Sequence, residues 1–268
     1  MSTRKAIFIT GGGSGIGRET AIYFAERGWF VGLGDVNEQG MRDTEGLLPG
    51  GFSYSHKLDV RDRKQWDEAL EAFATAAGGR IDVVFNNAGV GSGGELAGME
   101  QDEIDRCLDV NLRGVIYGAQ AAYPYLKKTA PGSALINTSS AAGIMGTGGM
   151  SIYCATKFGV RAVTESLDAE WADDGITVAS ICPSFIDTPL LDGTGSRGSN
   201  ELIRTRVTEA GLEITPASEV AKAVWDAVHG DELHYLVGKT AKRLNFAKRW
   251  MPGRARKMAR RNLKPLGQ

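Results

Sequence analysis

The chain has 268 residues, of which 42% are hydrophobic, and it carries a formal net charge of −1 at pH 7. This length can bury a large core in one α/β domain, and the balanced charge argues against a nucleic-acid-binding protein. Three cysteines without paired spacing argue against a disulfide framework and a metal site. No apolar run approaches the roughly 18 residues that span a bilayer, and the first strand-like run leaves no room before it for a signal peptide. We therefore expect a cytoplasmic protein without a bound metal.

Short β-rich runs alternate with helical patterns along the chain. The runs expected to be strands are 6–10, 30–33, 56–59, 81–86, 134–138 and 177–182. The helical patterns between them are 18–27, 38–47, 63–76, 101–127 and 153–171. Strands joined through helices at this spacing pair in parallel by right-handed crossovers. The predicted fold is therefore α/β, with one doubly wound parallel sheet and helices on both faces.

The predicted domain organisation is simple. Residues 1–238 are expected to form one domain, and residues 239–268 a basic C-terminal extension. Within the domain, the stretch 192–200 reads DGTGSRGSN, which is typical of a flexible loop. We expect a substrate lid near residues 190–211.

A glycine-rich segment joins the first expected strand to the first expected helix. It reads TGGGSGIG from Thr10 to Gly17. Glycine lets the backbone approach a pyrophosphate closely, and a helix N-terminus offers free N–H groups to it. A plain structural turn is the alternative for such a segment. The residues expected to contact a dinucleotide here are Gly11, Ser14, Gly15, Ile16 and Gly17.

An acidic residue follows the second expected strand. Asp35 lies 18 residues beyond Gly17, close to the spacing of about 20 expected for an acid that binds the adenosine ribose. A carboxylate there accepts the ribose hydroxyls and repels a 2′-phosphate. Neither Ser14 nor Val36 supplies a basic side chain for that phosphate, and Arg18 is expected on the helix surface. The sequence therefore predicts NAD in preference to NADP.

With these motifs in place, the chain resembles the short-chain dehydrogenase/reductase family from about Arg4 to Leu191. The spacing TGxxxGxG resembles the shorter-chain branch, whereas the epimerase-like branch usually shows TGxxGxxG. The resemblance implies a Rossmann-type sheet with further cofactor-binding residues. These are Asp59 and Val60 at the adenine position, and Asn87, Ala88 and Gly89 in the NNAG element that begins at Asn86.

A tyrosine and a lysine four residues apart carry the chemical half of the resemblance. Tyr153 and Lys157 share one helix face, and Ser140 lies 13 residues before the tyrosine, as in the family. Asn111 matches the family's helix asparagine. The resemblance implies that Asn111, Ser140, Tyr153 and Lys157 are catalytic, and that Tyr153 and Lys157 also contact the cofactor.

The chemistry fits these residue types. Removing an alcohol proton as hydride leaves requires a base, and the reverse reaction requires an acid. Tyrosine can serve as both, but its ordinary pKa is about 10. We expect the Lys157 cation to lower that pKa. Ser140 is expected to polarise the substrate oxygen, and Asn111 to hold a water that links Lys157 to solvent.

Two positions after the last expected strand complete the implied cofactor site. Ile186 and Thr188 match residues beside the nicotinamide, and Thr188 is expected to contact its carboxamide. The family usually has Pro-Gly just before them, and this chain has Pro183-Ser184. An added side chain at that point puts the local turn in doubt, although not the assignment.

The substrate region is mostly apolar. Its candidate wall residues are Gly91–Gly94, Ala142, Ile144, Met145, Met150, Phe185, Leu190 and Leu191. An apolar wall favours a hydrophobic secondary alcohol or ketone over a charged sugar or an acyl carrier. Several of these residues fit a plain core equally well. The histidines at 56, 229 and 234 have no motif around them and are not expected to be catalytic.

The C-terminal extension is strongly basic. Residues 239–268 hold 11 Lys and Arg and no Asp or Glu, whereas the rest of the chain holds 20 basic and 32 acidic residues. Three hypotheses remain open. The extension is a solvated surface or a contact with the acidic body, a peripheral attachment to an anionic membrane, or a subunit contact.

These features predict an NAD(H)-dependent oxidoreductase that interconverts a secondary alcohol and a ketone, EC 1.1.1.-, and acts as a homodimer or homotetramer. A non-catalytic NAD-sensing protein is one alternative, and an NAD-using epimerase or dehydratase is another. The complete catalytic set argues against the first, and the glycine spacing argues against the second.

Overall fold

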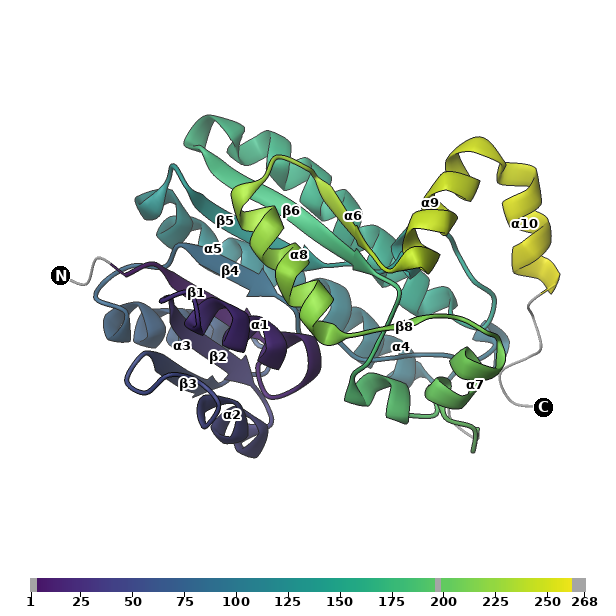
Figure 1. Ribbon diagram of the computed structural model, residues 1–268, viewed down its shortest axis with the longest axis horizontal. Helices are drawn as coiled ribbons and strands as arrows, with labels where there is room; N and C mark the ends of the chain where they lie inside the picture. Colours follow the sequence, from purple (N-terminus) through teal and green to yellow (C-terminus); the bar gives the residue numbers. More distant parts are fainter. Residues whose placement is uncertain (1–3, 196–198, 262–268) are drawn as a thin grey trace.

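Seven parallel strands form the central sheet of the computed structural model, which describes residues 4–195 and 199–261 (Figure 1). Their order across the sheet is β3-β2-β1-β4-β5-β6-β9. Their bounds are Ala6–Thr10 (β1), Phe30–Asp35 (β2), Ser53–Lys57 (β3), Val83–Asn86 (β4), Ser133–Thr138 (β5), Ile176–Pro183 (β6) and His234–Val237 (β9). A short second sheet pairs β7 (Phe185–Ile186) with β8 (Ile214–Thr215). The predicted doubly wound α/β fold is confirmed.

Helices cover both faces of this sheet. The α-helices are α1 (Gly15–Ala25), α2 (Glu38–Glu45), α3 (Arg63–Ala76), α4 (Gln101–Leu108), α5 (Gly114–Thr129), α6 (Ser151–Trp171), α7 (Ile203–Glu209), α8 (Ala217–His229), α9 (Lys239–Trp250) and α10 (Pro252–Arg261). Helices α1 and α8 pack together on one face, and α3 and α5 pack together on the other. The central strands are buried on both sides, as parallel strands require.

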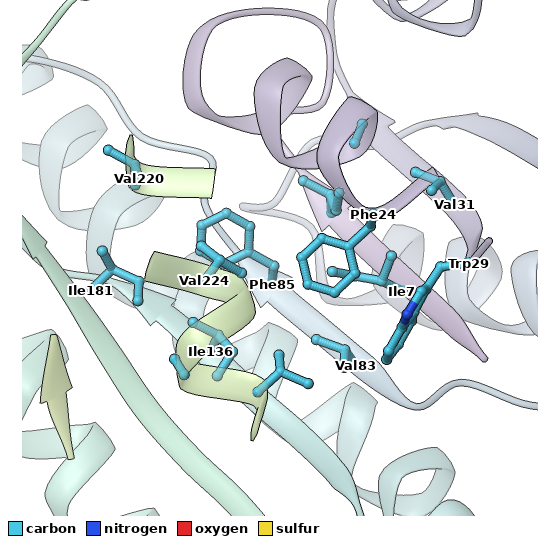
Figure 2. Close-up of a cluster of buried hydrophobic side chains, with 14 of the residues drawn as sticks. Ile7, Phe24, Trp29, Val31, Val83, Phe85, Ile136, Ile181, Val220 and Val224 are labelled. Carbon is cyan, nitrogen blue, oxygen red and sulfur yellow. The ribbon is translucent and has the colours of Figure 1, made fainter. Parts of the chain in front are cut away.

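Each face has its own apolar core. On the α1–α8 face, Phe24 lies against both Trp29 and Trp225 with ring centroids 5.1 and 5.2 Å apart. Figure 2 shows Phe24 and Val224 converging on side chains of the sheet, such as Phe85. On the opposite face, the fully buried Trp66 anchors α3. These two cores hold the ends of the strands in a fixed arrangement.

The sheet has a topological switch point between β1 and β4. From there β2 and β3 follow on one side and β5 and β6 on the other. In an open parallel sheet, ligands bind outside the carboxyl ends of the strands at such a switch point. The glycine-rich segment follows β1, and the NNAG segment follows β4. Both therefore lie at the edge where a ligand site is expected.

Several predicted element boundaries are wrong. The third strand is Ser53–Lys57, in place of the predicted 56–59, because the apolar residue of that run, Leu58, is buried just after the strand ends. Helix α1 begins at Gly15, three residues before the predicted start. The predicted helix 101–127 is interrupted by a π-helical turn at Asp109–Arg113.

The C-terminal part holds elements that the sequence pattern did not reveal. β9 adds a seventh strand beside β6, and α8 precedes it. The basic extension forms two helices, α9 and α10, within its described residues. Among the helices of residues 4–195 and 199–261, none is long and apolar enough to cross a membrane.

Candidate active site

The glycine-rich turn is shaped by glycines at backbone positions that other residues rarely occupy. Gly11 and Gly15 have φ values of 68° and 51°, in the left-handed region. A Cβ at Gly17 would overlap the carbonyl oxygen of Gly11, so α1 approaches the turn as closely as it does only because this residue is glycine. The N-terminus of α1 therefore opens onto the turn, with Ser14 exposed at its cap and Ile16 packed against the core.

The Asp35 carboxylate lies at the mouth of this turn. Its Oδ2 accepts a hydrogen bond from the Gly13 amide at 3.0 Å, and its Oδ1 accepts one from the Asn37 amide at 2.9 Å. An ionised carboxylate has about four acceptor positions, so these two bonds orient the group without exhausting it. Arg18 donates to the Gly13 carbonyl at 2.7 Å and to Thr44 at 3.1 Å. The Arg18 guanidinium thus stabilises the glycine-rich turn.

Asp59, which is predicted to lie beside the adenine, is bound by a neighbouring arginine. Arg61 binds both carboxylate oxygens, with a shortest distance of 2.6 Å. This bond lowers the pKa of Asp59 below its usual range. Val60 is buried, and its carbonyl accepts the Trp66 indole at 3.1 Å. Asp59 and Val60 are therefore both held in place in the segment that follows β3.

Thr10 ties the NNAG segment to the glycine-rich turn. Its hydroxyl oxygen accepts the amides of Asn87 and Ala88 at 3.0 and 3.1 Å. The Asn87 side chain donates to the Thr10 carbonyl at 2.9 Å. The ends of β1 and β4 thus form one continuous floor.

Asn111 lies within the π-helical turn and is fully buried. Its side-chain amide pairs with the backbone of Val90, accepting from N at 2.8 Å and donating to O at 2.9 Å. It also donates to the Cys107 sulfur at 3.5 Å. A Cβ built on Gly89 would lie 3.3 Å from the Asn111 Oδ1 and 3.8 Å from the Lys157 Nζ. Asn111 and Lys157 therefore flank the NNAG segment together.

Ser140, Tyr153 and Lys157 converge beyond the end of β5. The phenol of Tyr153 hydrogen-bonds Ser140, whose hydroxyl also donates to the Pro183 carbonyl at 3.4 Å. The Lys157 Nζ lies 5.6 Å from the centre of the Tyr153 ring and donates to the Thr138 carbonyl at 2.9 Å. The structure thus brings together all four residues that the sequence predicts to be catalytic.

The protonation of this pair differs from the expectation. Burial raises the pKa of Tyr153 to about 12, and the Ser140 hydrogen bond offsets only part of that rise. Burial also lowers the pKa of Lys157 to about 8, because its ammonium has little water around it. In the chain alone, burial therefore dominates the pKa of the phenol, and the lowering by Lys157 stays a prediction for the site with NAD bound.

The segment after β6 closes over the turn. Ile186 is buried in the α1–α8 core, and Thr188 donates to its carbonyl at 3.2 Å. A Cβ on Gly15 would lie 3.0 Å from the Thr188 side chain, so the two segments touch. Ser184, which stands where the family has glycine, points toward Gly238 and Thr215. Its side chain leaves the turn intact.

The predicted substrate wall is only partly open. Gly94 bonds Gly149 through the backbone at 2.8 Å, and Gly91 lies opposite Leu190. These contacts bring the three predicted wall segments together. Ile144 and Leu191 are buried and belong to the packed interior, whereas Met145 and Met150 are half-buried.

The predicted lid holds a 3₁₀ turn at Pro189–Asp192 and helix α7. Arg204 of α7 reaches back to Asp187 and Asp192, each at 2.7 Å. These two bonds connect α7 to the segment beside Thr188. Part of the predicted flexible loop, residues 196–198, lies outside the described residues.

Two features of the site were not assigned from the sequence. Thr10 begins the glycine-rich motif, but its hydrogen bonds to Asn87 and Ala88 depend on how the strands pair. Cys107 lies four residues before Asn111, and its contact with that amide depends on the helical pitch there. A third group, Ser180–His234–Glu165, is hydrogen-bonded at 2.8 and 3.0 Å. Since Ser180 is fully buried, this group holds β9 to β6 and α6.

The arrangement defines an oxidoreductase built on a doubly wound parallel sheet. The family model described as short chain dehydrogenase matches residues 5–197. The chain therefore belongs to the short-chain dehydrogenase/reductase family.

Individual relatives agree with this membership. The probable oxidoreductase EphD of Mycobacterium tuberculosis is 38% identical over 194 residues, or 70% of this chain, but the chain spans only 32% of that protein's length. Levodione reductase of Leifsonia aquatica is 32% identical over 229 residues, covering 82% of this chain and 84% of the relative. A solved family member from Burkholderia phymatum in complex with NAD matches with a TM-score of 0.83 at 25% identity, over 99% of this chain and 98% of that one.

Proposed function

We propose that this protein is an NAD(H)-dependent dehydrogenase that interconverts a hydrophobic secondary alcohol and its ketone. The observation that carries the proposal is the convergence of Ser140, Tyr153 and Lys157 beside the floor formed by Thr10 and the NNAG segment. A buried lysine beside a half-buried phenol is costly to the fold, and such groups cluster at functional sites.

The residues around the glycine-rich turn fit NAD. Gly11, Gly15 and Gly17 leave the turn without side chains where a pyrophosphate would approach the N-terminus of α1. Asp35 keeps acceptor positions for ribose hydroxyls, and its charge disfavours a 2′-phosphate. Val60 and Ala88 would line the adenine side, and Ile186 and Thr188 the nicotinamide side.

The proposed chemistry needs one proton carrier and one polarising donor. When bound, NAD supplies the hydride acceptor and a positive charge. Tyr153 takes the alcohol proton in oxidation and returns it in reduction, while Ser140 holds the substrate oxygen by a hydrogen bond. Lys157 would bind the nicotinamide ribose and position it relative to the phenol. Asn111 holds the backbone at Val90, just after the NNAG segment.

The apolar surroundings of this site support a hydrophobic substrate. Met145, Met150 and Phe185 are half-buried near the catalytic group, and Leu190 faces Gly91. The similarity to a levodione reductase, by name an enzyme acting on a ketone, also supports a ketone as the substrate. We propose that the segment 190–211 acts as the lid over this substrate.

We also propose that the protein works as a homodimer or homotetramer. Ile116 on α5 and Phe158 on α6 are exposed apolar side chains that a second copy would cover. Light scattering measures the assembly directly, and a monomer at every protein concentration would contradict it.

A panel of secondary alcohols and ketones, followed at the nicotinamide absorbance, tests the proposed function. We expect turnover with NAD(H) and apolar members of the panel. Binding of NAD without turnover of any member would instead support a cofactor-sensing protein.

Cofactor choice is expected to depend on Asp35. Replacing it with alanine removes charge-assisted hydrogen bonds worth about 1.5–3 kcal/mol, so kcat/KM for NAD should fall by about 10- to 100-fold while that for NADP rises or holds. Asp35→Asn is the matched control, since it keeps the size and removes the charge. Equal kcat/KM for both cofactors in the unmodified protein would contradict the assignment.

The protonation of Tyr153 is expected to change when NAD binds. In the chain alone the raised pKa of about 12 keeps the phenol protonated at pH 10.5, where an ordinary tyrosine with a pKa of about 10 is mostly ionised. A bound positive charge lowers that pKa. Alcohol oxidation should then rise with pH through the lowered pKa, and ketone reduction should fall.

Tyrosine NMR titration measures the pKa of Tyr153 without and with NAD, and Tyr153→Phe assigns the signal. A Tyr153 phenol that titrates at or below pH 10 without NAD would contradict the burial argument.

A further inference from the structure

The two C-terminal helices carry an apolar pair on the side facing away from the body. Phe246 and Trp250 are one helical turn apart on α9 and are 58% and 65% exposed. The inner side of the same helix holds Ala241, which is fully buried, and Leu244, which packs with it. A surface helix of a globular protein usually turns its large apolar side chains toward the core. Here they face solvent.

Positive charge surrounds this apolar pair. Lys242 and Arg243 are exposed and lie on the same outer half of α9 as Phe246. The Arg249 guanidinium lies 5.4 Å from the centre of the Trp250 ring, and exposed Arg254, Arg256 and Lys257 lie on α10. Within the described part of the extension, the one ion pair joins Lys239 to Glu213 at 3.3 Å. The charge of Arg243 also helps to lower the pKa of Glu213. No ion pair joins a carboxylate to the other cations of the extension whose side chains the structure describes.

The two helices are held to each other and to the body. Ala255 of α10 is buried, and α10 packs on α9. Figure 1 shows them together at one end of the molecule, apart from the central sheet. The charges and aromatic rings are therefore presented on an ordered surface.

We propose that α9 and α10 dock this protein on an anionic lipid bilayer. Tryptophan and phenylalanine enter the interface between headgroups and acyl chains, while lysine and arginine bind anionic headgroups. Lys242 and Arg243 share the outer side of α9 with the two exposed rings. That combination fits a lipid surface better than an acidic protein, which would match the charges and leave the rings in water.

Docking also bears on the substrate, and this step rests on the proposed function. The inner side of α9 packs against Ala141 and Ile144, which directly follow Ser140. A bilayer bound to the outer side would lie one helix diameter from that segment, about 10 Å. The substrate class that fits is an apolar secondary alcohol or ketone dissolved in the membrane.

Vesicle binding by the full chain tests the docking. The probes are phosphatidylcholine vesicles with and without phosphatidylglycerol, at low and high salt. We expect binding only to the anionic vesicles, weakened at high salt as the Debye length shrinks from about 30 Å at 0.01 M to about 3 Å at 1 M. Lys242→Gln with Arg243→Gln should weaken binding about 30-fold.

A tryptophan signal separates lipid docking from other polyanion contacts. Trp250 should shift its fluorescence to shorter wavelength on anionic vesicles, and Trp250→Phe should lose that shift. Lys64→Gln, a neutralised exposed lysine on α3, is the control that should bind as the unmodified chain does. Absence of binding to anionic vesicles, equal binding to neutral ones, or binding without the Trp250 shift would each overturn the docking.

The substrate step has its own readout. With a water-soluble alcohol, the Lys242→Gln, Arg243→Gln variant should match the unmodified enzyme. With a long-chain secondary alcohol carried in anionic vesicles, the variant should be slower. Equal rates with the vesicle-borne alcohol would overturn the substrate step while leaving docking intact, and inactivity of both proteins with both alcohols would overturn the proposed function instead.

Discussion

Replacing Tyr153 with phenylalanine is expected to lower kcat for alcohol oxidation by about 10²- to 10⁴-fold, the range that general acid–base catalysis contributes. The substitution removes one hydroxyl and keeps the ring, which lies 5.6 Å from the Lys157 Nζ. The Ser140 hydroxyl loses its bond with the phenol but keeps its bond with the Pro183 carbonyl. The Kd for NAD should therefore stay close to that of the unmodified protein. Steady-state rates and a fluorescence titration with NADH give the two quantities.

Another phenol serves as the matched control for this change. Tyr123 lies on α5 away from the site and hydrogen-bonds Asp174 at 2.6 Å. Tyr123→Phe also removes a single hydroxyl, and we expect its kcat to stay unchanged. A Tyr153→Phe variant that turns over as fast as the Tyr123→Phe variant would show that a different group carries the proton.

Replacing Lys157 with methionine is expected to abolish activity and to stabilise the fold. Lys157 is 4% exposed, and burial lowers its pKa from 10.5 to about 8. That difference costs about 3 kcal/mol of folding free energy at pH 7, where the buried ammonium is charged. Methionine fills a similar volume without a charge. Urea unfolding at pH 7 should therefore show a more stable variant with no turnover.

The pH dependence of this gain has a definite sign. Because the folded-state pKa lies below the unfolded one, the unmodified protein binds fewer protons when folded, and its stability rises with pH between about 8 and 10.5. The advantage of the methionine variant should shrink across that window. Lys64→Met, at an 84% exposed side chain, should show neither effect. A Lys157→Met variant less stable than the unmodified protein at pH 7 would show that the ammonium stabilises the fold.

Most of the sheet could be predicted because its strands are short apolar runs between glycine-rich or helical segments. β1, β2, β4, β5 and β6 all follow this pattern. The edge strands do not. β3 reads SYSHK and is half-buried, and β9 reads HYLV and is only four residues long, so neither has a run of buried apolar residues.

The positions of the four proposed catalytic residues were predictable because each lies at a fixed spacing from another motif of the chain. Their protonation was not. The pKa of Tyr153 depends on how much water the folded chain removes from the phenol, and that burial comes from segments far apart in sequence. The bond between Asp59 and Arg61 is local, but its bidentate geometry depends on the turn after β3.

The outward-facing aromatic residues of α9 could not be placed from sequence either. Periodicity alone would assign Phe246 and Trp250 to a packed face. Only the burial of Ala241, with Leu244 packed beside it, shows which side of the helix meets the body.

Isotope transfer tests the central claim most directly. Ketone reduction with NADH deuterated on the transferred position should yield an alcohol that carries deuterium on its carbinol carbon, and Tyr153→Phe should yield almost none. Unlabelled product, or an isomerised substrate with no net oxidation of NADH, would contradict the proposed dehydrogenase.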